Sequence, residues 1–251
     1  MGDFFIGYED LHKSFGPKMV LRGVNLQVRE GETLVILGGS GSGKSVLLRH
    51  TIGLLSPDRG RVLVDGTDVT SLAEEELVPV RKKVGMLFQG GALFDSMDVF
   101  ENVAYALREH TDLSDDEIAS RVRQKLELVG LDASVEGLMP SSLSGGMRKR
   151  VALARSIALE PRAILYDEPT TGLDPVTAHA INLMIRSLQR TLNVTSVVVT
   201  HDIASAFEVG DRVAFLYDGG MVFVGSVDEA RHTADPRLRM FLTGGAGGDV
   251  A

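Results

Sequence analysis

The chain has 251 residues, 44% of them hydrophobic and 24% charged, with a formal net charge of −8. This composition is typical of a globular protein with a sizeable core, and the acidic balance argues against a nucleic-acid partner, which favours a basic face. The absence of cysteine excludes disulfides and thiolate metal sites.

No apolar run approaches the roughly 20 residues that span a bilayer. The start, MGDFFIGYED, lacks the basic and apolar regions of a secretory signal. We therefore expect a cytoplasmic chain whose membrane association, if it has one, depends on a protein partner.

The first elements are short runs rich in β-branched and apolar residues. FIGYEDLHKSF and VNLQV read as strands, and TLVIL is a third strand that leads directly into a glycine-rich loop. A helix is expected after the loop, from Ser45 to about Gly53, where the glycine suits a left-handed cap.

The glycine-rich loop, GGSGSGKS, spans residues 38–45 and matches the phosphate-binding pattern G-x-x-x-x-G-K-[ST] in full. Its glycines let backbone N–H groups converge on phosphate oxygens, and the following helix N-terminus adds positive potential. Lys44 would reach the β- and γ-phosphates, and the Ser45 hydroxyl would ligate Mg²⁺.

The middle of the chain, from Asp98 to about Ser142, has a helical pattern. Ser114 and Glu117 form a capping box that opens a periodic apolar stripe ending at Gly130. After LSGG, a further helix, MRKRVALARSIALE, is expected to stop near Pro161.

Strands and helices then alternate: AILYDE, a helix from Asp174, TSVVVTH, a helix from Asp202, and RVAFLYDG. Alternation of this kind predicts an α/β fold with a mostly parallel, helix-covered sheet and a helical insert. The closing residues 243–251 read as a flexible tail.

A second metal-binding element is expected at the end of an apolar strand. AILYDE supplies Asp167, which can hold Mg²⁺ directly or through water, and Glu168, placed to orient or deprotonate a water that attacks the γ-phosphate. A strand-end Asp-Glu pair is weak evidence alone, but it gains weight downstream of a phosphate-binding loop.

Taken together, these motifs resemble an ABC-transporter ATPase subunit over nearly the whole chain. GGSGSGKS, Gln89 after an apolar strand, LSGGM, ILYDEP, TGLD and VVVTHD occur in the family's order and approximate spacing. The resemblance implies a P-loop NTPase (RecA-like) core with an N-terminal β-rich part, formed by residues 1–89 and 160–242. It also implies an inserted helical subdomain at residues 90–159.

The resemblance also assigns roles. Gln89 would contact Mg²⁺ or the attacking water, His201 would contact the γ-phosphate, and Glu168 would be catalytic. Asp174 suits a helix N-cap, since Pro175 follows it, and in the family it also belongs to a loop at the dimer interface. The ATP-binding residues would be Phe15, which would stack on adenine, and Gly38, Gly39, Ser40, Gly41, Ser42, Gly43, Lys44, Ser45 and Val46.

LSGG is explained by the family's head-to-tail dimer, in which each ATP lies between the P-loop of one chain and LSGG of the other. Ser144 and the N–H groups of Gly145 and Gly146 would face the partner's γ-phosphate. Met147 stands where the family consensus has Gln, so any contact made by that amide is absent here.

The stretch MLFQGGALFDSMDVFENVAYALREH and the run SGGMRKRVALARSIALEPRAILYDEPTTGLDP are similar to the ATPase of MCE-type (Mla) phospholipid transporters. That resemblance implies a second copy of the chain, an integral-membrane permease contacted by residues 89–108, an MCE-domain protein and a STAS-domain protein. It also implies a peripheral location on the inner face of the cell membrane.

Two alternatives stay open at this point. The chain fits the ATPase of a polar-solute importer of the amino-acid type, which neighbouring genes for a solute-binding protein would indicate. A soluble ABC protein acting on ribosomes or DNA usually has two cassettes or a long heptad coiled coil, and neither is present here. A catalytically silent cassette is disfavoured because Lys44, Gln89, Glu168 and His201 are all present.

Overall fold

The computed structural model describes residues 4–244, so most of the expected tail, from residue 245 on, lies outside the described residues. The chain divides into two compact units. The first unit comprises residues 1–81 and 195–251, and the second comprises residues 82–194. The expected domain boundaries near residues 90 and 160 stay a prediction.

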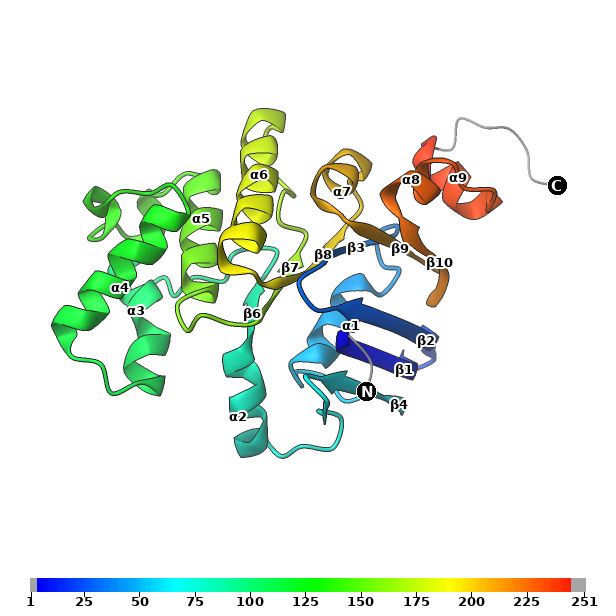
Figure 1. Cartoon of the computed structure of the whole chain (residues 1–251), viewed down its shortest axis with the longest axis horizontal. Helices are drawn as coiled ribbons and strands as arrows, with labels where there is room; N and C mark the ends of the chain where they lie inside the picture. Colours follow the sequence, from blue (N-terminus) through cyan, green and yellow to red (C-terminus); the bar gives the residue numbers. More distant parts are fainter. Residues whose placement is uncertain (1–3, 245–251) are drawn as a thin grey trace. The chain divides into compact units, whose positions relative to one another are not determined.

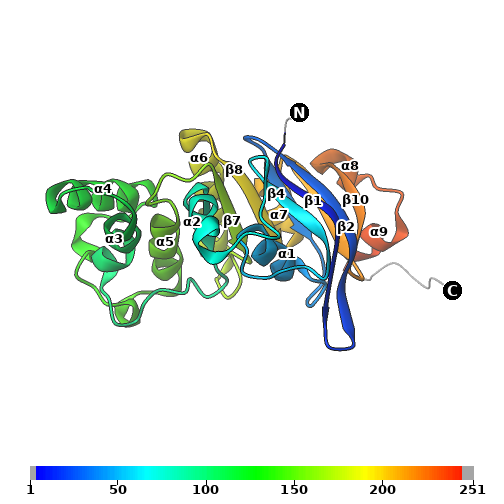
Figure 2. The same cartoon turned by 90° about the horizontal axis from the view of Figure 1, so that it is seen from below.

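The N-terminal part of the first unit is an antiparallel sheet with strand order β2-β1-β4-β5. Its strands are β1 (Phe4–Phe15), β2 (Lys18–Arg29), β4 (Arg59–Val64) and β5 (Thr67–Asp68). Strands β1 and β2 form a hairpin that pairs Phe15 with Lys18 across the Gly16–Pro17 turn (Figure 2). Gly16 has a positive φ of 56°, which glycine adopts without strain.

The second sheet of this unit contains β3 (Thr33–Leu37), β8 (Thr195–Thr200), β9 (Arg212–Tyr217) and β10 (Gly220–Ser226). Strand β3 is parallel to both β8 and β9, and β10 closes the edge as an antiparallel partner of β9. Every residue of β3 and β8 is buried, as expected for parallel strands covered on both faces.

Helix α1 (Lys44–Thr51) contacts both β4 and β8. The Tyr8 hydroxyl on β1 lies 2.6 Å from the Thr51 hydroxyl at the end of this helix, and both side chains are buried. This buried hydrogen bond fixes α1 against the antiparallel sheet, and so fixes the helix that follows the P-loop.

The other helices of this unit are α7 (Ile203–Val209), α8 (Val227–Arg231) and α9 (Pro236–Leu242). Asp202 and Asp235 accept hydrogen bonds from backbone N–H groups at the starts of α7 and α9. The expected helix after Asp202 is confirmed, whereas the helical character of α8 and α9 is not anticipated by the sequence pattern.

The second unit pairs β6 (Val84–Leu87) with β7 (Ala163–Asp167) in parallel and adds four long helices. Helices α3, α4 and α5 contact one another and lie together in both views (Figures 1 and 2). Two short 3₁₀ turns, Ala133–Val135 and Pro140–Ser142, precede α5. The helices are α3 (Val99–His110), α4 (Asp115–Leu128), α5 (Gly145–Ser156) and α6 (Pro175–Leu192).

The predicted α/β class and several helix starts are confirmed. The Ser114–Glu117 capping box opens α4, and Asp174 caps α6 with Pro175 at its first position. Within the described residues, no helix combines the length and the apolar character that a membrane crossing requires.

Two local predictions differ from the structure. Helix α5 ends at Ser156 rather than near Pro161, because the chain tightens into i→i−3 hydrogen bonds and Glu160 adopts a left-handed φ of 53°. Helix α2 (Glu74–Lys83) is not predicted by the sequence pattern, and it holds Pro79 in its interior, a position that normally argues against a helix.

Candidate functional site

The P-loop, residues 38–43, connects the buried strand β3 to helix α1. Gly43 has a φ of 106°, and a Cβ there would lie 2.9 Å from Leu21 Cδ2. At Gly38 an added Cβ would lie 2.6 Å from the carbonyl oxygen of Leu216. Glycine is therefore required at both ends of the loop, by conformation at Gly43 and by close packing at Gly38.

Lys44 is 6% exposed, and its ammonium donates hydrogen bonds back to the loop. Nζ lies 2.8 Å from Gly38 O and 3.1 Å from Gly39 O. Gly43, at the N-cap of α1, provides no side-chain cap to the first N–H groups of this helix. The loop thus brings a cation and a helix N-terminus together, an arrangement that binds phosphate.

His201 is exposed and follows β8, the neighbour of β3. The parallel register pairs Leu37 with Thr200, so the P-loop and His201 leave the sheet at the same edge. Phe15, at the end of β1, is 47% exposed, and Lys13 Nζ lies 5.6 Å from its ring centroid. The exposed part of the Phe15 ring is thus available for stacking.

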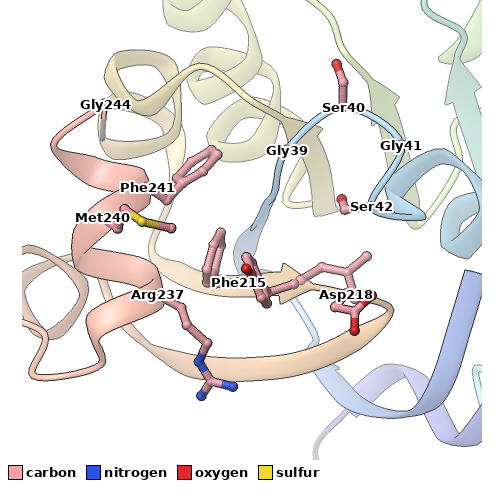
Figure 3. A pocket seen from close by; sticks show the side chains of 12 residues that line it. Gly39, Ser40, Gly41, Ser42, Phe215, Asp218, Arg237, Met240, Phe241 and Gly244 are labelled. Carbon is pink, nitrogen blue, oxygen red and sulfur yellow. The ribbon is translucent and has the colours of Figure 1, made fainter. Parts of the chain in front are cut away.

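A pocket of about 700 Å³ lies on the β9 side of the P-loop. Figure 3 shows Ser40, Gly41 and Ser42 on one wall and the rings of Phe215 and Phe241 on another. The centroids of these two rings are 5.1 Å apart. Neither Phe15 nor Lys44 lines this pocket, which adjoins the expected nucleotide site only through the P-loop residues 39–42.

In the second unit, Gln89 and Glu168 follow the parallel strands β6 and β7. The register pairs Leu87 with Tyr166, and the same offset places Gln89 beside Glu168 at the carboxyl edge. Asp167 is 3% exposed and Glu168 is 8% exposed, whereas Gln89 is exposed. The three predicted residues are therefore neighbours at one edge of this strand pair.

Glu168 has a left-handed backbone, with a φ of 50°. For a residue with a side chain this conformation costs about 1–2 kcal/mol, so neighbouring contacts must hold it. Thr171 supplies two of them: its hydroxyl donates to Glu168 Oε2 at 3.1 Å, and its N–H donates to Glu168 O at 3.3 Å.

Lys149 on α5 is a residue of this edge that the sequence motifs do not indicate. The side chain is 6% exposed, and Nζ donates to the carbonyl oxygen of Gln89 and, at 3.5 Å, to that of Glu168. Burial lowers the pKa of Lys149, while the nearby carboxylates of Asp167 and Glu168 act to raise it. The sequence signal that could indicate a buried Lys149 is its position one turn before Leu153, on the apolar face of the helix.

The LSGG motif ends at the N-terminus of α5. The Ser144 hydroxyl accepts a hydrogen bond from the Met147 N–H at 3.2 Å, a contact that any residue other than proline at position 147 can make. A Cβ on Gly146 would lie 2.8 Å from Thr177 Cγ2 on α6, whereas one on Gly145 would lie 3.5 Å from Leu173 Cδ2. Gly146 therefore serves the packing of α5 on α6 within one chain.

Asp174 caps the other helix of this contact. Its Oδ1 accepts hydrogen bonds from the N–H groups of Val176 and Thr177, each at 3.0 Å, and its Oδ2 accepts one from the Thr177 hydroxyl at 2.5 Å. The Thr177 bonds are the main cause of the lowered pKa of the Asp174 carboxyl.

A buried parallel strand leading into a complete P-loop, with LSGG at a helix start and Asp-Glu at a strand end, defines an ATP-binding cassette. The ABC transporter family profile matches residues 21–171, more than half of the chain. The protein belongs to the ABC transporter family and is an ATPase.

Two relatives match this chain over nearly its whole length. The chain is 44% identical over 245 residues to the intermembrane phospholipid transport system ATP-binding protein MlaF of Escherichia coli K12, covering 98% of this chain and 91% of that one. It is 42% identical over 239 residues to the probable ribonucleotide transport ATP-binding protein mkl of Mycobacterium leprae, covering 95% and 69% of the two chains.

Two solved structures share the fold. A dimeric ATP-binding cassette in a post-hydrolysis state, bound to ADP and Pi, has a TM-score of 0.82 at 34% identity and covers 88% of this chain and 98% of that one. The cbiO1 protein of Clostridium perfringens, part of the ABC transporter complex cbiONQ, has a TM-score of 0.83 at 30% identity, with 96% of each chain covered.

The close contact at Gly146 gives a prediction about stability. Gly146→Ala should lower the free energy of unfolding by about 1–3 kcal/mol, the usual cost of overpacking, because the new methyl group meets Thr177 Cγ2. Gly145→Ala has ordinary space and should be neutral or stabilising.

Adding Thr177→Ser to Gly146→Ala removes the clashing methyl and keeps the hydroxyl that bonds Asp174, so stability should return. Urea unfolding of the three variants provides the measurement. Equal effects of the two alanine substitutions would contradict the packing role of Gly146.

Proposed function

We propose that the chain is the ATPase of a phospholipid transport system of the Mla type, in which it works as a dimer with a membrane permease. The observation that carries this proposal is the 44% identity to MlaF over 98% of the chain. The amino-acid importer alternative is not favoured, because the relatives that match over 98–100% of this chain and 91–94% of their own length are named for phospholipid transport.

The contacts within each unit support the residue roles that we propose. Lys44 and the P-loop N–H groups would bind the phosphates of ATP, with Phe15 on adenine and His201 on the γ-phosphate. Glu168 would orient or deprotonate the attacking water, because it is a carboxylate held in a fixed backbone conformation at a strand end.

Magnesium fits the oxygen donors that these residues offer. Among the described residues there is no cluster of three or more His, Cys, Asp or Glu side chains that could form a cage for a metal ion. Mg²⁺ at nucleotide sites is instead held by one or two carboxylates, a hydroxyl and the substrate phosphates. The Asp167 carboxylate, the Ser45 hydroxyl and the Gln89 amide would provide the protein ligands, and the ion would neutralise developing phosphate charge.

A head-to-tail dimer would place Ser144, Gly145 and Gly146 of one chain at the γ-phosphate bound by its partner, with Asp174 at the interface. Ser144 and Gly145 are exposed at a helix N-terminus, which supports this role. The permease would contact residues 89–108, and an MCE-domain and a STAS-domain protein would complete the complex. The chain would lie on the inner face of the cell membrane.

The role of Glu168 predicts a separation of binding from turnover. Glu168→Gln should leave ATP affinity unchanged while hydrolysis falls at least about 100-fold, within the range of general-base contributions. Nucleotide binding by fluorescence and phosphate release measure the two effects, with Lys44→Ala as the variant that loses affinity. Near-normal hydrolysis in Glu168→Gln would remove Glu168 from this role.

The dimer can be tested by cross-linking because the chain has no native cysteine. Ser40→Cys and Gly145→Cys are both at exposed positions, and Gly145 has ordinary space for a side chain. In a Glu168→Gln background, a mixture of the two single-cysteine chains should form a covalent dimer with ATP and a short thiol cross-linker.

Each cysteine chain alone should give little covalent dimer. A chain with both cysteines is the internal control, since a cross-link in cis keeps the monomer mass. If the double-cysteine chain forms a cross-link within the monomer and the mixture forms no covalent dimer, the head-to-tail arrangement is rejected.

The transport assignment predicts the composition of the native complex. Affinity purification from detergent-solubilised membranes should recover a polytopic permease and an MCE-domain protein, and mass spectrometry should detect bound phospholipid. Recovery of a solute-binding-protein importer without an MCE component would refute the phospholipid assignment and leave the ATPase assignment intact.

A further inference from the structure

The helix that begins at LSGG also reaches the catalytic strand ends of its own chain. Lys149, in the second turn of α5, donates from one ammonium group to the carbonyl oxygens of Gln89 and Glu168. These are the two residues expected to contact and activate the attacking water. A single side chain of α5 therefore joins the backbones that follow β6 and β7.

The location explains why a lysine is needed. Gln89 and Glu168 lie just beyond the ends of β6 and β7, where the backbone is no longer paired in the parallel ladder. Carbonyl oxygens that have left the ladder need other donors, and an ammonium group offers three N–H bonds on a flexible stem. A neutral aliphatic side chain of the same length would fill the space and leave those acceptors without this donor.

The Glu168 backbone depends on such contacts. Its left-handed φ of 50° aims the side chain, and its carbonyl oxygen is held by the Thr171 N–H and by Lys149. Thr171 holds the carboxylate as well, at Oε2. The hydrogen bonds of Lys149 go to backbone acceptors, so this lysine can set the orientation of Glu168 without occupying its carboxylate.

A second cation of α5 holds the same segment after β6. Arg155 Nη2 donates to the carbonyl oxygen of Gly91 at 3.0 Å. Gly91 has a φ of 80°, and a Cβ added there would lie 3.4 Å from Ala152 Cβ on the same helix. Residues 89–91 are therefore fixed to α5 at two backbone points, and Lys149 is the point that also reaches Glu168.

We propose that Lys149 is a positioning residue for ATP hydrolysis, which couples the helix carrying LSGG to the backbones of Gln89 and Glu168 in the same chain. The proposal rests on the proposed role of Glu168 in activating water. The N-terminus of α5 would face the partner's nucleotide. A change in the orientation of this helix would therefore change the position of Glu168 in its own chain.

The test compares kcat, ATP affinity and thermal stability in full-length variants. Lys149→Met keeps most of the unbranched apolar stem but removes all donors, so kcat should fall about 10- to 100-fold, the effect expected of a displacement near 1 Å. ATP affinity should stay within about twofold, because the P-loop is unchanged. Lys149→Arg keeps a cation with several donors and should recover part of kcat.

The matched control is Lys125→Met on α4. Lys125 is also buried, at 2% exposed, and its Nζ bonds the Glu160 side chain at 2.9 Å, before the start of β7 rather than at its carboxyl end. This variant removes a buried lysine from the same unit and should keep kcat within about twofold. An equal loss of kcat in both lysine variants would mean a general structural effect and would overturn the proposal.

A double variant separates this proposal from the role of Glu168. If Lys149 acts through Glu168, then Lys149→Met should reduce the residual hydrolysis of Glu168→Gln little further, whereas independent effects would multiply. If Lys149→Met is fully active and Glu168→Gln is inactive, the positioning role of Lys149 is rejected and the role of Glu168 is kept. If Glu168→Gln has normal activity, the proposed role of Glu168 is rejected, and the Lys149 proposal, which rests on it, is rejected with it.

If Lys149→Met does not fold, Lys149→Gln decides the question. Its shorter amide reaches fewer acceptors than the ammonium, so kcat should fall while affinity and melting temperature are maintained. Wild-type kcat in a folded Lys149→Gln variant would overturn the proposal.

Discussion

Parallel strand pairing is the constraint on which the candidate residues of each unit depend. Parallel strands all end at the same edge, so residues far apart in the sequence become neighbours without any long-range side-chain recognition. In the first unit this places the P-loop after β3 beside His201 after β8. In the second unit it places Gln89 after β6 beside Glu168 after β7. The helices then supply what the strand ends lack, namely positive charge and the N–H groups of their first turns.

Local rules explain why much of this fold is readable from the sequence. The P-loop, the Ser114–Glu117 capping box and the Asp174–Pro175 helix start are encoded within a few residues, and each forms as its pattern indicates. Each depends on short-range chemistry: the conformational freedom of glycine in the P-loop, a side-chain cap in the capping box, and the missing N–H of proline at the start of a helix. Such signals can be read without knowledge of tertiary contacts.

Features that depend on tertiary contacts are not readable in the same way. Helix α2 forms despite Pro79, and α5 stops at Ser156 although its apolar pattern continues. After the end of α5, Glu160 bonds Lys125 on α4, a partner that no local pattern names. Lys149 escapes prediction for the same reason, since its acceptors are backbone carbonyls and leave no mark in the residue types at positions 89 and 168.

The bonds from Lys44 to Gly38 and Gly39 have a consequence for how nucleotide enters. The lysine already closes the loop on itself, so the loop's shape does not have to be ordered by phosphate at the moment of binding. Arriving phosphate exchanges carbonyl acceptors for stronger, charged ones, and little conformational entropy remains to be lost. Nucleotide capture then includes an exchange of acceptors at the Lys44 ammonium group, and substitutions that stiffen the loop further should change the association rate little.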